Sequence, residues 1–174
     1  MGAQWVLEFG TASTGPHQVL LWVLDTRSLV RQARAHLRES LQRSGVNGDA
    51  LGEAELAVAE LATNAKLHAR SPFELRVIVT GGVPVWCEIA DGDPDPGNIP
   101  AVLERLRTAR TPGDGIEDLV AQATMIQEGG RGLLLVHHLS DGHCCVYPTL
   151  LLSTGAIGKA VAFSLPAPAP VAVG

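Results

Sequence analysis

Six stretches of the chain carry apolar residues in alternation or in short unbroken runs, which is the pattern of β-strands. The predicted strands cover residues 4–9, 19–24, 73–80, 83–90, 144–152 and 160–165. Only Gly81 and Gly82 separate the third from the fourth, and such a pair favours a tight hairpin turn. A turn-forming segment at 10–16 separates the first two, so we expect these to pair as well.

Between these stretches, apolar residues recur every three or four positions, which predicts helices. One helix, which Asp25, Thr26 or Ser28 could cap, has apolar positions at helical spacing from Leu29 to Leu41 and is expected to stop at Gly45. A longer helix, rich in alanine and leucine, is expected from Asp49 to about Ala69. A short apolar helix is expected over Leu133–Leu139.

The order of these elements predicts an α/β (α+β) two-layer sandwich, with a mixed, mostly antiparallel sheet covered on one face by helices. A length of 174 residues suits one domain with a sizeable core. We expect this domain to span 1–165, and the proline- and alanine-rich residues 166–174 to form a flexible tail. The polar segment 98–128 contains charged, weakly helical pieces that prolines and glycines interrupt, and it is expected to form a mobile lid.

The amino-acid composition restricts the possible functions of the chain more than it restricts the possible folds. Hydrophobic residues make up 46% and charged residues 18% of the chain, which is typical of a globular protein. The net charge of -5 argues against a nucleic-acid binder, whose surface is usually basic. A local basic patch on the first predicted helix is left open, although a solvated helix face explains the same residues, which are Arg27, Arg31, Arg34, Arg38 and Arg43.

Neither a membrane anchor nor a disulfide framework is indicated. No apolar run approaches the roughly 18 residues of a membrane span, and we expect no N-terminal targeting signal. Three cysteines cannot all pair, so we expect reduced thiols in a cytoplasmic protein. The histidines and cysteines of residues 137–145 crowd together, but their spacing matches no ordinary zinc pattern.

A polar stripe interrupts the long predicted helix. Glu60, Asn64 and His68 lie four residues apart and therefore share one face. Their neighbours are apolar or small, so the helix is largely buried and the stripe must meet another group. An amide oxygen such as that of Asn64 suits Mg²⁺, and Glu60 could accept a proton from an attacking hydroxyl. An exposed stripe with ordinary intrahelical hydrogen bonds explains the same spacing.

Asp91 ends a predicted apolar strand and is followed by Gly92. A carboxylate in this place could accept the exocyclic amine of adenine, and glycine would let the backbone approach the ring. The Asp-Gly sequence equally favours a simple Asx-turn.

A glycine-rich segment, Gly129-Gly130-Arg131-Gly132, precedes the short apolar helix. Glycines at the N-terminus of a helix expose N–H groups that bind phosphate, and Arg131 adds a charged, forked donor. The segment lacks the Gly-Lys-Ser/Thr ending of a Walker loop. A flexible loop before a core helix is the alternative.

Taken in order, the three segments resemble the N, G1 and G2 boxes of the GHKL ATPase superfamily. The likeness extends over about residues 28–165; it rests on Glu-Leu-Ala-Thr-Asn-Ala-Lys-Leu-His-Ala at 60–69 and Gly-Arg-Gly-Leu at 130–133. Within the superfamily, the short chain looks most like the anti-sigma-factor serine/threonine kinases and related actinobacterial ATP-binding regulators. The resemblance implies that ATP and Mg²⁺ are bound.

By this resemblance Glu60 would be the catalytic base, Asn64 the Mg²⁺ ligand and Asp91 the reader of adenine. The other residues of the implied nucleotide site are His68, Asp93, Gly130, Arg131, Gly132 and Leu133. Two positions depart from the superfamily pattern. Asp93 replaces a glycine of the G1 box, and Ala160 replaces a threonine that is expected near the adenine.

The resemblance further implies a cytoplasmic regulator that binds a sigma factor and phosphorylates a serine or threonine of an antagonist protein. Direct contact with nucleic acid or membrane is not expected, and a homodimer is left open. One alternative is a non-catalytic protein-binding module of the same fold. Another is the catalytic domain of a histidine kinase, although no pair of dimerisation helices with an acceptor histidine is evident.

Overall fold

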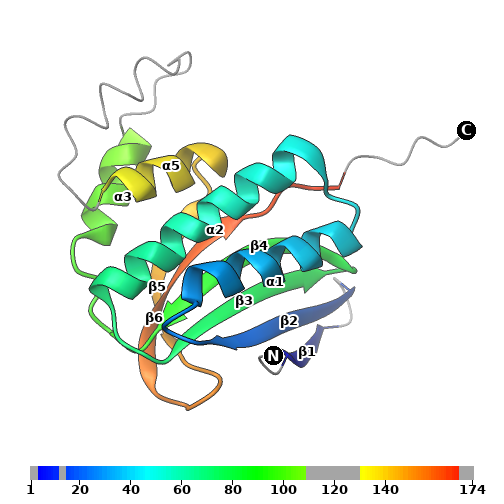
Figure 1. Ribbon diagram of the computed structural model, residues 1–174, viewed down its shortest axis with the longest axis horizontal. Helices are drawn as coiled ribbons and strands as arrows, with labels where there is room; N and C mark the ends of the chain where they lie inside the picture. Colours follow the sequence, from blue (N-terminus) through cyan, green and yellow to red (C-terminus); the bar gives the residue numbers. More distant parts are fainter. Residues whose placement is uncertain (1–3, 12–14, 109–129, 169–174) are drawn as a thin grey trace, which may run out of the picture.

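Six strands form a single sheet in the computed structural model, which describes residues 4–11, 15–108 and 130–168 (Figure 1). They are β1 (Gln4–Thr11), β2 (Gly15–Leu24), β3 (Phe73–Thr80), β4 (Val83–Asp91), β5 (Cys144–Leu150) and β6 (Ile157–Ser164). The spatial order is β1-β2-β3-β4-β6-β5, and every neighbouring pair is antiparallel. The last of the described strands in sequence, β6, therefore lies inside the sheet, between β4 and β5.

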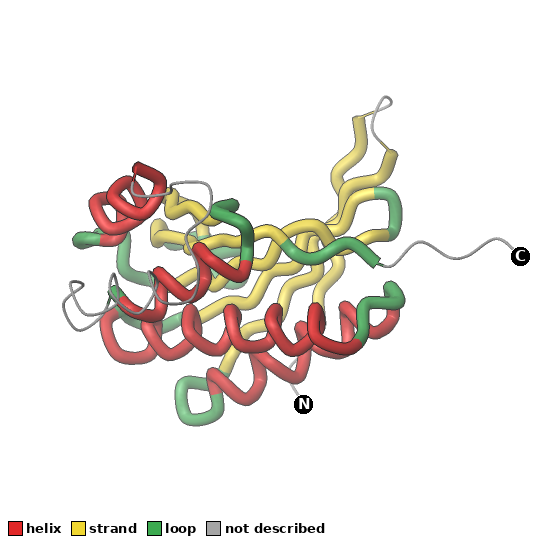
Figure 2. Tube along the Cα trace, turned by 90° about the horizontal axis from the view of Figure 1, so that it is seen from above, coloured by secondary structure: helices red, strands yellow, loops and turns green. Residues whose placement is uncertain are grey.

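Helices cover one face of this sheet (Figure 2). In the described part of the chain they are α1 (Leu29–Arg43), α2 (Gly48–His68), α3 (Ile99–Thr108) and α5 (Arg131–Leu139). The core lies between the two layers, because successive side chains of a strand point to opposite faces. Leu75, Ile89 and Phe163 contribute the helix-facing side chains of three neighbouring strands and are at most 1% exposed.

The two-layer α+β architecture predicted from the sequence is confirmed, with a sheet that is antiparallel throughout. One difference concerns the first part of the expected lid. Residues 99–108 form α3, whose Val102, Leu103 and Leu106 are buried in the main core. Their spacing places them on one helical face, so this part is a packed element. The rest of that segment, 109–128, lies outside the described residues, as do Gly129 and most of the expected tail.

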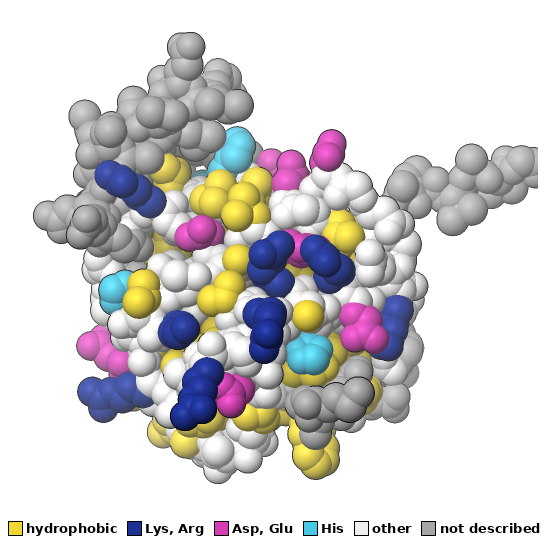
Figure 3. All heavy atoms as spheres, viewed as in Figure 1, with side chains coloured by type: hydrophobic (Ala, Val, Ile, Leu, Met, Phe, Trp, Pro, Cys, Tyr) yellow, Lys and Arg dark blue, Asp and Glu magenta, His cyan; other side chains and the backbone are white. Residues whose placement is uncertain are grey.

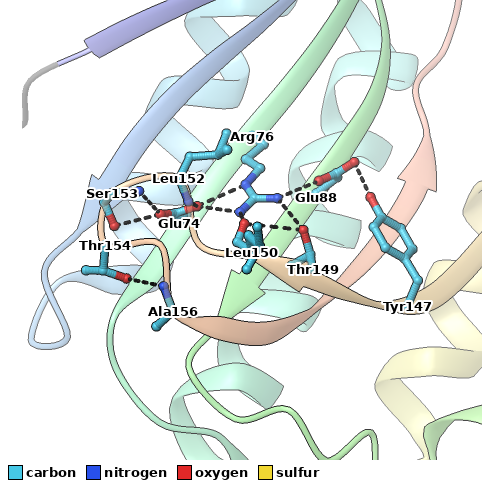
Figure 4. A network of polar contacts seen from close by, with 10 residues as sticks. All are labelled: Glu74, Arg76, Glu88, Tyr147, Thr149, Leu150, Leu152, Ser153, Thr154 and Ala156. Atoms are coloured by element: carbon cyan, nitrogen blue, oxygen red, sulfur yellow. Dashed lines mark hydrogen bonds and ion pairs between the residues drawn. The ribbon is translucent and has the colours of Figure 1, made fainter.

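The other face of the sheet is partly covered by the segment that joins β5 to β6. Glu74, on β3, accepts hydrogen bonds from the Ser153 amide (2.7 Å) and hydroxyl (2.6 Å) and from the Leu152 amide (3.2 Å). Arg76 donates to Glu74 Oε2 (2.7 Å) and to the Leu150 carbonyl (2.6 Å) (Figure 4). The buried ion pair therefore ties residues 150–153 to the middle of the sheet.

The same network continues across the sheet to Glu88 and Tyr147 (Figure 4). Arg76 lies 3.7 Å from a carboxylate oxygen of Glu88, and the Tyr147 hydroxyl donates to that carboxyl group. Burial raises the pKa of Glu88 above its ordinary value, although Tyr147 and Arg76 oppose the shift. On the sheet face opposite the helices, side chains of β3, β4 and β5 are therefore linked in one network.

Arginines of α1 contribute to the basic surface over α1 and α2 that Figure 3 shows. Arg34 and Arg38 both donate to Glu55, which projects from α2 and is 4% exposed. Two of the arginines for which the sequence left a basic patch open therefore join the two long helices.

No helix in the described part of the chain has the length and apolar composition that crossing a membrane requires. Cys87, Cys144 and Cys145 are free thiols.

Candidate functional site

A cavity of about 270 Å³ lies between α2, the end of β4 and β6. Its size is close to the lower end of the range for small-molecule pockets, roughly 300–1,000 Å³. The apolar part of its wall comes from Leu61, Ile89, Ile99, Leu133 and Val161. Such a wall suits the flat faces of an aromatic ring, and a few polar groups set its orientation.

The polar part of the wall centres on a buried ion pair. Lys159 Nζ lies 2.9 Å from Asp91 Oδ1 and 3.0 Å from the Asp93 carbonyl oxygen. The Asp93 amide also donates to Asp91 Oδ1, at 2.9 Å. Asp91 is 2% and Lys159 6% exposed, so both charges lie in a poorly solvated place. Burial raises the pKa of the Asp91 carboxyl above its ordinary value, against the opposing effects of Lys159 and the Asp93 amide.

Two glycines allow the backbone to close around this pair. A Cβ on Gly158 would lie 2.0 Å from the Asp91 carbonyl oxygen, and a Cβ on Gly92 would lie 2.7 Å from the Ser71 carbonyl oxygen. Contacts that short are not tolerated, so glycine is required for β6 and the turn after β4 to approach so closely. The close approach fixes Asp91 beside Lys159, its cross-strand partner.

A second group of polar side chains lies where α2 meets the start of α5. A Cβ on Gly132 would lie 2.7 Å from Glu60 Oε2 and 3.1 Å from Asn64 Nδ2. Gly130 is the N-cap of α5, and its carbonyl accepts the Leu134 amide at 3.0 Å. The first N–H groups of a helix have no partner within the helix and favour an anion. Glu60 and Asn64 are therefore adjacent to a place that suits phosphate.

The structure brings most of the residues singled out in the sequence into one region. Asn64, His68, Asp91 and Leu133 line the cavity. Glu60 lies against Gly132, next to the N-cap Gly130 and the exposed Arg131. The polar stripe of α2 thus faces the glycine-rich start of α5 and the end of β4, and these are three separate segments of the sequence.

Neither of the two residues that depart from the superfamily pattern is among those that line the cavity. Asp93 contributes its backbone to the ion pair, and its carboxylate accepts the Asp95 amide at 3.2 Å. Ala160 packs with Ala90 and Leu151 on the opposite face of the sheet. The positions of β6 that line the cavity are Lys159 and Val161, on either side of Ala160.

Sequence reasoning gave Lys159 no role in the site. A signal was present, because Lys159 is the only charged residue of β6, whose other residues are apolar or small. A lone lysine in a buried strand needs a partner, since an unpaired buried charge is very costly. What the sequence did not show was that Asp91, 68 residues earlier, is that partner.

The residues present fit a nucleotide with a divalent cation. The apolar wall and the Asp91–Lys159 pair suit a base, and the start of α5 suits phosphates. Among the described residues, no group of three or more His, Cys, Asp or Glu side chains could hold a metal ion by itself. A Mg²⁺ ion would therefore depend on Asn64, on phosphate oxygens and on water, which is how Mg²⁺ usually binds beside phosphates.

A comparison with protein-family models agrees with this geometry. Residues 24–147 match the model of the histidine kinase-like ATPase domain. The match includes the α2 stripe, Asp91 and the start of α5, whereas Lys159 lies beyond it. No curated protein matches the chain.

Proposed function

The chain belongs to the family of histidine kinase-like ATPase domains, of the GHKL type, and on this premise we propose that it is a cytoplasmic anti-sigma factor with serine/threonine kinase activity. It would bind Mg²⁺–ATP, a sigma factor and an antagonist protein that it phosphorylates. ATP binding is the common property of the family. The kinase activity and the two protein partners are the specific content of the proposal.

The observation that carries the proposal is the packing of Glu60 and Asn64 against Gly132. Phosphoryl transfer needs mainly positioning and charge stabilisation, together with a group that accepts the proton of the attacking hydroxyl. Glu60 has the carboxylate for this last task, and it lies beside the helix start that favours phosphate. Asn64, one turn later, has the amide oxygen that a phosphate-bound Mg²⁺ can take as a ligand.

Two single substitutions test the proposal. Glu60→Ala is expected to leave ATP affinity nearly intact and to reduce phosphorylation of the antagonist by about 100-fold or more, the usual contribution of a general base. Asn64→Ala is expected to weaken both, because it removes the metal ligand. ATP affinity is measured by calorimetry with and without Mg²⁺, and transfer by γ-labelled ATP with each candidate antagonist.

Glu53→Ala is the matched control, because Glu53 is an exposed glutamate of the same helix, two turns before Glu60. This substitution is expected to change neither the ATP affinity nor the phosphorylation of the antagonist. Full phosphorylation by Glu60→Ala would contradict the role of Glu60 as base.

A non-catalytic binding module of the same fold is the second candidate. The observation in its favour is the Asp91–Lys159 pair, since the charge of the carboxylate assigned to adenine is compensated within the protein when no nucleotide is bound. A wild-type chain that binds ATP and a partner protein, yet transfers no phosphate to any candidate antagonist, would support this alternative over the kinase.

A further inference from the structure

The Asp91–Lys159 pair presents a hydrogen-bond donor and an acceptor side by side in the wall of the cavity. An ammonium group has three N–H donors, and two of those on Lys159 are directed to Asp91 Oδ1 and the Asp93 carbonyl. Both bonds that the Asp91 carboxylate makes here end on Oδ1. These three hydrogen bonds therefore do not use one N–H of Lys159 or the Oδ2 atom of Asp91.

A ligand that fits such a pair has a donor and an acceptor on adjacent atoms. The Watson–Crick edge of adenine has this arrangement, because the exocyclic amine is next to the acceptor N1. Enzymes that read a single base do so by hydrogen bonds to this edge. The edge is flat, and the apolar cavity wall suits the ring behind it.

We propose that Lys159 reads the base, donating to N1 of adenine while Asp91 accepts the exocyclic amine. The inference rests on the proposed function in that it takes ATP as the ligand. It adds a specificity-determining residue from a strand that the family match does not reach. It also assigns the buried Lys159 a role beyond neutralising the Asp91 carboxylate.

A 6-oxopurine presents the opposite order, with a carbonyl oxygen beside a protonated N1. Lys159 could then donate to the carbonyl oxygen and Asp91 could accept from N1. ATP is favoured because the chain belongs to an ATPase family. GTP and ITP are therefore included as competitors in the test.

The experiment compares ATP with 1-deaza-ATP, in which a C–H group replaces N1. Binding of both is measured by calorimetry for the wild type, Lys159→Met and Lys66→Met. The last is the matched control, since Lys66 is the other lysine of the chain and is exposed on α2. Wild type and Lys66→Met are expected to bind 1-deaza-ATP roughly 10- to 100-fold more weakly than ATP, the effect of one charge-assisted hydrogen bond.

Lys159→Met is expected to bind ATP with a similar loss and to show no difference between ATP and 1-deaza-ATP. Equal affinity of the wild type for the two nucleotides would overturn the role of Lys159, and so would undiminished ATP affinity in Lys159→Met. Preference of the wild type for GTP or ITP, lost in Lys159→Met, would overturn the assignment of adenine.

Two outcomes separate this inference from the function on which it rests. ATP binding that does not depend on N1 removes the base-reading role alone, whereas a wild-type chain that binds no adenine nucleotide overturns both. Lys159→Met leaves the Asp91 carboxylate buried without its cation, so its folding is checked by circular dichroism. If Lys159→Met does not fold, the inference is tested by the affinities of the wild-type chain for ATP and 1-deaza-ATP, and equal affinities overturn it.

Discussion

At the scale of single residues, Gly132 joins the start of α5 to the polar stripe of α2. Gly132→Ala would place a Cβ close to the ends of the Glu60 and Asn64 side chains, which can rotate away. We therefore expect the fold to keep its stability, since alanine is a better helix former than glycine by up to about 1 kcal/mol. Phosphoryl transfer is expected to fall, because the proposed base and metal ligand are displaced. Thermal unfolding and transfer of labelled phosphate measure the two effects.

The chain offers a matched control for this substitution. Gly52 lies in α2, and a Cβ there would meet nothing within 4 Å. Gly52→Ala makes the same chemical change away from the site and should leave transfer unaltered. If Gly132→Ala transfers phosphate as fast as Gly52→Ala, the contact with Glu60 and Asn64 has no part in the reaction.

A second residue-scale prediction concerns Asp91. Asp91→Asn keeps the shape of the side chain but replaces an acceptor-only carboxylate with an amide, so the proposed charge-assisted hydrogen bond to the adenine amine would be lost. ATP affinity is expected to fall by about 1.5–3 kcal/mol. Calorimetry measures the loss, and Asp49→Asn, at an exposed position of α2, is the control. Unchanged affinity in Asp91→Asn would count against Asp91 as the reader of the base.

At the scale of elements, α1 and α2 are joined through Glu55. The Arg38 guanidinium holds the pKa of the Glu55 carboxyl below its ordinary value near 4.5, and Arg34 adds to this against the effect of burial. Because the pKa is lowered on folding, the stabilisation is present above about pH 4.5 and is lost as the pH falls through the folded-state value. Acid should therefore loosen the pairing of the two long helices.

The corresponding prediction uses Glu55→Gln. Both arginine side chains are about half exposed, so the ion pairs are screened and their removal is expected to lower the free energy of unfolding by only about 1 kcal/mol at pH 7. The difference from the wild type should shrink at pH 3. Urea denaturation at both pH values measures it. Glu39→Gln, which removes an exposed pair with Arg43, should have a smaller effect, and an equal effect would contradict the importance of Glu55.

The elements themselves were well predicted from the sequence, because their signals are local. The hairpin at Gly81-Gly82 and the helix from Gly48 to His68 follow from glycine placement and apolar spacing. Helix α3 was predicted only as a weakly helical piece of the expected lid, because its short apolar face lies in a stretch rich in charge and proline. Partners distant in sequence were also missed, such as Lys159 with Asp91, because only the sheet order brings β4 next to β6.

At the scale of the whole molecule, the buried Glu74–Arg76 pair holds the β5–β6 connection on the outer face of the sheet. Burial opposes ionisation of Glu74, but Ser153 and Arg76 together hold its pKa below the ordinary value. Glu74→Leu leaves Arg76 buried without its closest carboxylate and is expected to lower the free energy of unfolding by about 3–5 kcal/mol. Urea denaturation measures the loss.

A double substitution separates two causes of lost stability, the unpaired buried charge and the altered packing of the network. Glu74→Leu combined with Arg76→Met removes both charges, so we expect a smaller loss than for Glu74→Leu alone. A double variant that is less stable than the single one would mean that Arg76 stabilises the fold mainly through Leu150 and Thr149, to which it also donates.

The position of β6 inside the sheet has a consequence for the newly made protein. During synthesis Asp91 leaves the ribosome 68 residues before Lys159, which at about 5–20 residues per second is a delay of about 3–14 s. Throughout this interval the edge of β4 lacks its neighbouring strand β6, and the cavity wall lacks Lys159 and Val161. A nascent chain would therefore complete the proposed nucleotide pocket only after β6 has emerged and has inserted between β4 and β5.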